Sequence, residues 1–150
     1  MNNQTLIHQA TLNDLNAICE IALLLWLEDN SMLLIRQEIS QILADNKAVI
    51  FIASKNGDDV GFAHYQIRYD YVEGTVTTPV GYLEGIFVKE EHRLFGVGTK
   101  LIRASEEWLR TKNITEIASD TEIFNSASKQ FHIKQGFSDV NRIVCFSKRI

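Results

Sequence analysis

Residues 91–101 read EHRLFGVGTKL, a basic stretch with two glycines that follows the apolar run VGYLEGIFV at residues 80–88. Branched and aromatic residues dominate the apolar run and favour a central strand, whereas the residues after 99 carry apolar side chains at helical spacing. The sequence therefore predicts a strand, a glycine turn and a helix. Free N–H groups at the start of such a helix attract anions, and Arg93 adds a full positive charge, so the turn is suited to a diphosphate.

Three phosphate-binding motifs compete for this turn. A Walker A loop requires Gly-Lys-Ser/Thr, whereas here Thr99 precedes Lys100. A dinucleotide fingerprint requires a third glycine, and Leu101 occupies that position. The third motif, R/Q-x-x-G-x-G/A, is matched in full by residues 93–98. A capped turn without a ligand is the alternative, and the arginine, the strand and the helix around the glycines argue against it.

The whole chain has the composition of one globular domain. Its 150 residues are 45% hydrophobic and 23% charged, without repeats or low-complexity tracts, so we expect a single domain over residues 1–150. The net charge of -4 argues against DNA or RNA as a partner. We see no signal peptide or membrane span, which predicts a cytoplasmic protein that binds no membrane. Cys19 and Cys145 lie far apart in the sequence and predict buried free thiols, with no metal site.

Hydrophobic periodicity predicts strands and helices of both kinds, and therefore a mixed α/β (α+β) fold in which helices cover a sheet. Asn56-Gly57 is a strong hairpin signal between two of the strands. In chain order, the expected elements are a strand at 5–9, two amphipathic helices up to residue 43, strands at 48–54, 60–72 and 80–88, a helix at 99–112, a strand at 114–120, a helix at 126–135, and one or two closing strands over 136–150.

Residues 93–98 resemble the acetyl-CoA pyrophosphate loop of the GNAT superfamily of N-acetyltransferases. The resemblance covers nearly the whole chain, because the order of elements agrees and Asn125 with Gly136-Phe137 matches the family's N…GF pattern. It implies the GNAT fold, a mixed and mostly antiparallel central sheet flanked by about four helices, and acetyl-CoA as co-substrate. The resemblance assigns these residues to the cofactor: Ile86, Phe87 and Val88 to the pantetheine arm, Arg93, Leu94, Phe95, Gly96, Val97, Gly98 and Thr99 to the pyrophosphate, and Asn125 to the pantetheine or acetyl end.

Four further segments resemble the aminoglycoside 6'-N-acetyltransferases: Leu25-Trp26, DYVEG at 70–74, YLEGIFV at 82–88 and ASDT at 118–121. This resemblance implies an antibiotic-resistance enzyme that acts on the 6'-amino group, and a homodimer, for which the apolar run RIVCFSK could supply the interface. The residues it assigns to the drug site are Trp26, Asp29, Tyr71, Glu84 and Asp120, with Asn141 where the family often has an acidic residue.

The acidic and aromatic residues suit such a ligand. Aminoglycosides are polycationic sugars, so carboxylates pair with their ammonium groups and aromatic rings contact the less polar faces of the sugars. Each residue also has a purely structural interpretation: Trp26 as core, Tyr71 as packing at a strand end, Asp120 as a helix cap. Glu84 is harder to explain in that way, because a carboxylate inside an apolar run is costly to bury without a cationic partner.

The implied reaction is direct attack of the acceptor amine on the thioester in a ternary complex, without a protein nucleophile. Glu84 or Asp120 would accept the proton of the amine, directly or through water. His132 occupies the place where many GNAT enzymes have a tyrosine, so it either protonates the departing thiolate or only makes structural hydrogen bonds. Two alternatives stay open: a GNAT enzyme for another small amine or a protein N-terminus, and a non-catalytic acyl-CoA-binding module.

Overall fold

The centre of the molecule is a five-stranded sheet with the strand order β1-β2-β3-β4-β5. The computed structural model describes residues 4–25 and 31–150. The first four strands pair antiparallel, and β5 runs parallel to β4, so the predicted mixed, mostly antiparallel sheet is confirmed. The strands are β1 (Leu6–Gln9), β2 (Ala48–Lys55), β3 (Asp58–Arg68), β4 (Val80–Val88) and β5 (Ile117–Ser119).

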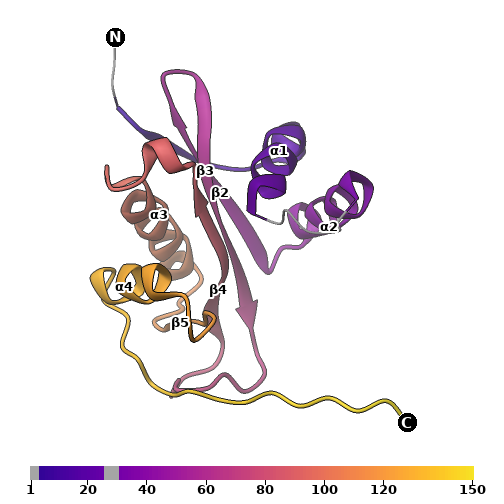
Figure 1. The fold of residues 1–150 in the computed structure, drawn as a ribbon, viewed down its shortest axis with the longest axis vertical. Coiled ribbons are helices and arrows are strands. Elements are labelled where there is room, and N and C mark those ends of the chain that lie inside the picture. The colour runs from indigo at the N-terminus through magenta and orange to yellow at the C-terminus, as the bar shows by residue number, and fades with distance from the viewer. Residues whose placement is uncertain (1–3, 26–30) are drawn as a thin grey trace.

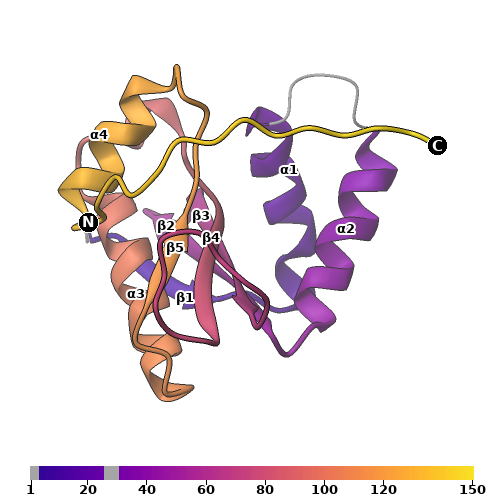
Figure 2. The same cartoon turned by 90° about the horizontal axis from the view of Figure 1, so that it is seen from below.

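Four α-helices cover the two faces of this sheet: α1 (Leu15–Leu25), α2 (Met32–Ala44), α3 (Val97–Thr111) and α4 (Ser126–Lys134). In Figures 1 and 2, α1 and α2 lie on one face, while α3 and α4 lie on the other. Residues of β2 alternate between the two cores, with Phe51 packed in the α3 core and Ile50 and Ile52 in the α1–α2 core. Residues 48–53 of this strand are all apolar because both of its faces are buried there, whereas Ser54 and Lys55 at its end are half-buried.

Several predicted boundaries are wrong: β3 ends at Arg68 rather than at residue 72, and β5 covers only residues 117–119 of the predicted 114–120. Two further errors have a physical reason. The helix after the glycine turn begins at Val97 rather than Thr99, because Gly96 adopts a left-handed conformation and already serves as its N-cap. The closing strands predicted over residues 136–150 are absent from the described structure. Instead, the segment leaves the body as an extended arm, which Figures 1 and 2 draw in yellow. A strand needs a neighbouring strand for its hydrogen bonds, and the arm has none among the described residues.

The arm also corrects the prediction for the cysteines. Cys19 is buried in α1 as expected, but Cys145 is exposed. Its exposure follows from its place in the arm, whose apolar side chains are exposed with it: Val140, Ile143, Val144, Phe146 and Ile150.

Candidate active site

The turn between β4 and α3 is held by one bond from a side chain to the backbone and by two left-handed backbone conformations. The Nε of Arg93 donates a hydrogen bond of 2.7 Å to the carbonyl of Val88, which folds the arginine back onto the end of β4. Leu94 and Gly96 have φ angles of 64° and 81°, in the left-handed region. The first N–H groups of α3, on Val97, Gly98 and Thr99, have no acceptor within the helix and point along its axis. The turn therefore presents the anion-binding end of a helix.

Helix α4 fixes this turn from the side. A Cβ placed on Gly98 would come within 2.8 Å of the Phe131 ring, so only glycine allows α3 and α4 to approach this closely. The side-chain amide of Gln135 donates a 3.0 Å hydrogen bond to the Thr99 hydroxyl. Leu94 and Phe95 remain exposed at the tip of the turn. Leu94, Phe95, Gly98 and Thr99, which were predicted for the cofactor, thus lie together around the start of α3.

Strands β4 and β5 stop pairing before this turn. Strand β5 pairs only with residues 81–83 of β4, so residues 84–88 have β3 on one side and no strand on the other among the described residues. The backbone of Ile86, Phe87 and Val88 lies in this open stretch, as predicted. An unpaired strand edge offers N–H and C=O groups to an extended ligand with amide groups of its own.

A β-bulge in β4 displays Glu84. Ile86 pairs with Ala63 and Gly85 with His64, but the next pair is Leu83 with Tyr65, so Glu84 is the extra residue without a partner. Bulges of this kind redirect a side chain and are frequent beside active sites. Glu84 is consequently an exposed residue, and the expected burial cost is avoided. The bulge predicted at Gly85 is present, and it places the carboxylate beside the open stretch of β4.

The cation that pairs with Glu84 is Arg68, which was not predicted from the sequence. Arg68, at the end of β3, donates to the Glu84 Oε1 atom from Nε at 3.0 Å and from Nη2 at 2.7 Å. Its guanidinium carbon lies 3.4 Å from the centre of the Tyr82 ring. The available signal was an arginine on the same face of β3 as two other polar residues, His64 and Gln66, but its partner depends on the bulge.

Asp120 directly follows β5, whose Ala118 pairs with Tyr82. Burial, followed by the Asp120 carboxylate, raises the pKa of the Tyr82 phenol to about 12. The Glu84 carboxylate acts on the same phenol, while Arg68 opposes both carboxylates. The structure thus brings the two predicted base candidates, Glu84 and Asp120, to the same tyrosine.

Tyr71 and Asn141 meet at a carboxylate that was not predicted for the site. The Tyr71 hydroxyl and the Asn141 amide each donate a 2.8 Å hydrogen bond to Glu73. These bonds, that of Asn141 first, lower the pKa of Glu73, and the bond to Glu73 raises the pKa of Tyr71. Asp139, the acidic residue two positions before Asn141, pairs with Arg142 at 2.8 Å. Trp26 and Asp29 lie outside the described residues.

His132 and Asn125 are both held by α4. The His132 Nδ1 atom lies 2.7 Å from the Ser128 carbonyl, and its Nε2 atom lies 2.9 Å from the Ser119 hydroxyl at the end of β5. The side-chain oxygen of Asn125, Oδ1, accepts a 3.0 Å hydrogen bond from the backbone N–H of Ser128 and caps the helix. Each residue therefore has a structural contact, and the Ser119 hydroxyl also donates to the Leu83 carbonyl at 3.2 Å. The Asn125 NH₂ group has no hydrogen-bond partner among the described residues.

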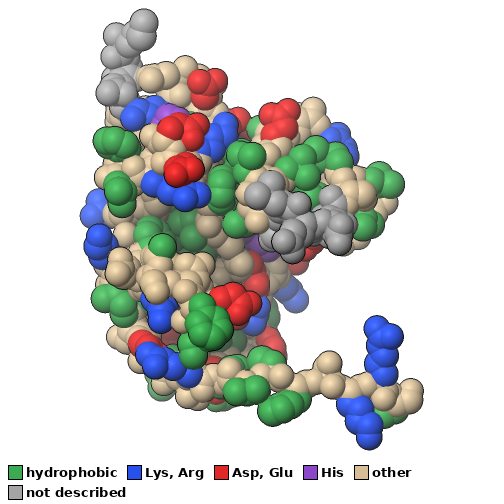
Figure 3. Space-filling model, viewed as in Figure 1, with side chains coloured by type: hydrophobic (Ala, Val, Ile, Leu, Met, Phe, Trp, Pro, Cys, Tyr) green, Lys and Arg blue, Asp and Glu red, His purple; other side chains and the backbone are tan. Residues whose placement is uncertain are grey.

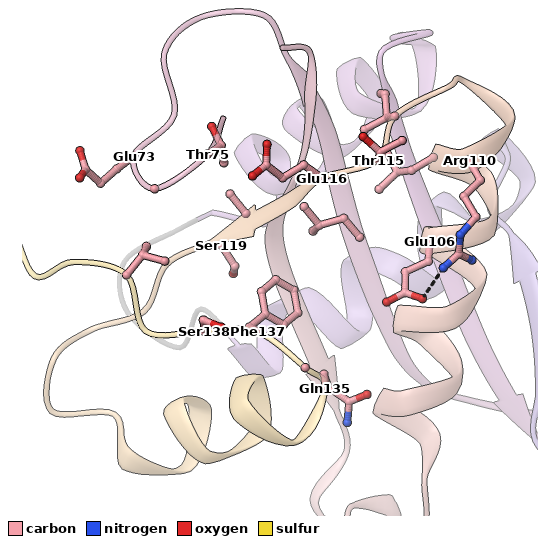
Figure 4. Close-up of a pocket in the computed structure, with 17 residues that line it drawn as sticks. Glu73, Thr75, Glu106, Arg110, Thr115, Glu116, Ser119, Gln135, Phe137 and Ser138 are labelled. Atoms are coloured by element: carbon pink, nitrogen blue, oxygen red, sulfur yellow. Dashed lines mark hydrogen bonds and ion pairs between the residues drawn. The ribbon is translucent and has the colours of Figure 1, made fainter. Parts of the chain in front are cut away.

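A cavity of about 660 Å³ lies beside β5, away from Glu84. Figure 4 shows side chains from the 73–75 loop, α3, β5 and the beginning of the arm around it. Within residues 4–25 and 31–150, no three His, Cys, Asp or Glu side chains are grouped as metal ligands. No helix in the same ranges has the length and apolar character needed to cross a membrane.

Comparisons with known proteins agree with this geometry. The model of the acetyltransferase (GNAT) family matches residues 15–137. The chain is 41% identical over 114 residues to an aminoglycoside N(6')-acetyltransferase type 1 of Acinetobacter haemolyticus, covering 76% of this chain and 79% of that protein. It is 37% identical over 141 residues to a protein of the same name from Stenotrophomonas maltophilia, covering 93% and 90%.

Among solved structures, AAC(6')-Iy in complex with the bisubstrate analogue CoA-S-monomethyl-acetylneamine superposes with a TM-score of 0.93 at 33% identity, covering 98% of this chain and 99% of that one. The predicted GNAT fold is confirmed. With its pyrophosphate turn, its splayed β4 and these relatives, the chain belongs to the acetyltransferase (GNAT) family.

Proposed function

We propose that this protein transfers the acetyl group of acetyl-CoA to the 6'-amino group of aminoglycoside antibiotics and so confers resistance to them. The relatives named aminoglycoside N(6')-acetyltransferase support this function. The observation that carries it is the bulge at Glu84, which places a carboxylate beside the open stretch of β4 and close to the anion-binding turn. A cofactor thioester and a cationic amine would meet there.

Acetyl-CoA would lie along the open stretch of β4. Its pyrophosphate would bind the turn of residues 93–99, where the helix dipole and the free N–H groups stabilise negative charge. The pantetheine amides would bond to the backbone of residues 86–88, and the NH₂ group of Asn125 would bond near the acetyl end. The contact between Gly98 and Phe131 keeps this groove in shape before the cofactor arrives.

The drug would bind on the side of the carboxylates. Glu84 and Asp120 would pair with ammonium groups near the reacting amine, and Glu73 would pair with a second ammonium between Tyr71 and Asn141. Trp26 and Asp29 complete the proposed drug site on the grounds of the sequence resemblance alone.

The reaction needs a neutral amine. Glu84 or Asp120 would take one proton from the ammonium, directly or through water, and the freed lone pair would attack the thioester carbonyl. A C–N bond forms, the C–S bond breaks, and a backbone N–H of β4 at Phe87 or Val88 would stabilise the oxyanion between these events. The coenzyme A thiolate then takes a proton, for which we propose His132, acting through or beside Ser119.

Kinetics of His132→Ala test this last role. If His132 is the acid, kcat falls at least tenfold and the pH profile of kcat changes shape. An unchanged profile and turnover would leave the ring with its structural bonds to Ser119 and Ser128 only.

A thiol-release assay with matched sugars tests the activity. We expect the purified protein to release coenzyme A with kanamycin-type drugs that carry a 6'-amino group, and none with the 6'-hydroxyl analogues. Release with polyamines or peptide N-termini alone would instead identify a GNAT enzyme for another amine. Binding of acetyl-CoA without release by any amine would indicate a sensing module.

We also propose that the protein is a cytoplasmic homodimer, in which each arm completes the sheet of the partner. The Glu116 carbonyl accepts a hydrogen bond from the Gly81 amide, so the backbones of Thr115, Ile117 and Ser119 face away from β4. These three residues line the cavity beside β5 (Figure 4). The open edge of β5 therefore faces a hollow that can accept one more strand.

The arm has the properties of that strand. Its first part is anchored to its own body, because Val140 packs on Gly74 and Asn141 bonds to Glu73. Beyond residue 141 it leads away from its own cavity (Figure 2). The sequence RIVCFSKRI at 142–150 combines β-branched and aromatic residues with three basic side chains and no acidic ones, and Figure 3 shows basic side chains gathered at its far end. The cavity offers Glu73, Glu106 and Glu116 as complementary charges.

Light scattering during gel filtration tests the homodimer. We expect a mass near twice the 17.1 kDa of one chain. The double variant Val144→Asp/Phe146→Asp should be monomeric and still bind acetyl-CoA, whereas Leu33→Asp, at an exposed apolar residue of α2, should remain dimeric. A monomeric wild type, or a double variant that stays dimeric, would contradict the exchange.

A further inference from the structure

The contact between Arg68 and Glu84 is unusual in its geometry. Two nitrogens of the guanidinium, Nε and Nη2, donate to the same carboxylate oxygen, Oε1, at 3.0 and 2.7 Å. No other group of the described residues bonds to this carboxylate, so Oε2 has no hydrogen-bond partner among them. The guanidinium also lies over the Tyr82 ring, with its carbon 3.4 Å from the ring centre. The arginine is thus fixed from one side while it fixes one half of the carboxylate.

Folding stability does not explain this arrangement. About a third of the Arg68 side chain and a quarter of the Glu84 side chain are exposed, at 33% and 27%. Ion pairs with this exposure contribute little to stability. Arg68 and Glu84 are also not cross-strand neighbours, because Arg68 lies opposite Val80 and Glu84 is the unpaired residue of the bulge. Its geometry therefore points to a role at the site rather than in the fold.

We propose that Arg68 is a positioning residue, which clamps one oxygen of Glu84 so that the other oxygen faces the acceptor amine. This inference rests on the proposed acetyl transfer and deepens it by assigning the support of the base. A free glutamate side chain on an exposed bulge would sample several rotamers. The fork to Oε1 and the stack on Tyr82 select one of them. Preorganisation of this kind raises the rate of the chemical step more than it raises substrate affinity.

The surrounding charges agree with this role. Asp120 acts on Tyr82 from the end of β5, and Arg68 is the cation among the groups that act on this phenol. The clamp leaves Oε2 available, so a drug ammonium can bind to Glu84 without displacing Arg68. Lysine would keep the charge but not the planar fork or the stack, and it should replace arginine only in part.

Three variants test the clamp by steady-state kinetics with a 6'-amino aminoglycoside. Arg68→Met keeps the aliphatic stem and removes the charge and the donors. We expect kcat to fall about 10- to 100-fold, while the KM values of drug and acetyl-CoA change less than about threefold. Arg68→Lys should recover part of the loss. The matched control Arg36→Met removes an exposed arginine of α2 that bonds to Asn16, and it should leave kcat unchanged.

A wild-type kcat in Arg68→Met would overturn the proposal, and so would equal activity of the Met and Lys variants. Crystal structures provide a readout that does not depend on turnover. Arg68→Met should show the Glu84 carboxylate in more than one rotamer, and a single unchanged rotamer would contradict the clamp. If the wild type acetylates no 6'-amino sugar, the proposed function fails, and the rotamer of Glu84 still decides whether Arg68 orients it.

Discussion

The two halves of the proposed site are built by different means. Backbone geometry and close packing hold the cofactor half: the left-handed Gly96, the contact of Gly98 with Phe131, and the bond from Arg93 to the Val88 carbonyl. Side-chain contacts at the surface hold the acceptor half, with Arg68 on Glu84 and with Tyr71 and Asn141 on Glu73.

Because the two halves are built differently, we expect them to tolerate different substitutions. Backbone contacts do not depend on side-chain charge, so the cofactor half should bind acetyl-CoA in many variants of the acceptor half. The acceptor half consists of exposed charges and includes the first residues of the arm, so it should respond to single substitutions and to loss of the partner chain. The predictions below test this separation.

The largest effect is expected for Glu84→Gln. The amide cannot accept the proton of the amine, so kcat should fall by about two to three orders of magnitude, as for loss of a general base. Calorimetric affinity for acetyl-CoA should stay within about twofold, since Glu84 takes no part in the pyrophosphate turn. Glu107→Gln, at an exposed residue of α3 that does not line the cavity, is the control for loss of a carboxylate. A matching loss of acetyl-CoA affinity in Glu84→Gln would show that the halves are not separate.

The next effect concerns folding stability at the junction of the two halves, where His64 lies opposite Gly85 at the bulge. Burial lowers the pKa of His64 to about 4. The unfolded chain then binds a proton near pH 6.5 that the folded protein does not bind, so stability is lost as the pH falls from about 6.5 to 4, by up to about 3 kcal/mol. Urea unfolding at pH 7.5 and pH 5 should show that the wild type loses about 2 kcal/mol more than His64→Leu. An equal loss in both proteins would refute the prediction.

A smaller effect is expected at the cofactor turn. Gly96 has a φ of 81° and Gly57 a φ of 87°, and a Cβ would meet no atom within 4 Å at either position. Alanine should therefore destabilise both turns by about 1 kcal/mol. Only Gly96→Ala should also weaken acetyl-CoA binding, by about tenfold, because the strain changes the turn that holds the pyrophosphate. Equal acetyl-CoA affinities of the two variants, measured by calorimetry, would speak against this site.

The smallest effect concerns Tyr71→Phe. The variant keeps the ring and removes the hydrogen bond to Glu73, so the KM for the drug should rise about two- to fivefold with kcat unchanged. Initial rates over a range of drug concentrations measure both constants. A change in kcat alone would mean that Tyr71 acts in the chemical step.

Local patterns predicted the cofactor half well. The strand, the glycine pair and the helix follow one another directly within residues 80–111, so their geometry follows from neighbours in the sequence. The helix start was misplaced by two residues because Gly96 was read as loop rather than as N-cap.

The acceptor half was harder to predict because its contacts join distant segments. The pairing of Arg68 with Glu84 requires the bulge register, and that of Asn141 with Glu73 spans most of the second half of the chain. The predictions of closing strands and of a buried Cys145 were wrong for the same reason. Periodicity shows that RIVCFSK can form a strand, but not whether its own chain supplies the neighbour.

The central claim is that the two halves meet at the 6'-amino group of a drug. Two-dimensional NMR of the product formed from acetyl-CoA and a kanamycin-type aminoglycoside tests it most directly. The account predicts one new acetyl group, with an amide correlation to the 6' methylene protons. An acetyl group on any other nitrogen, or a drug recovered unmodified, would contradict it.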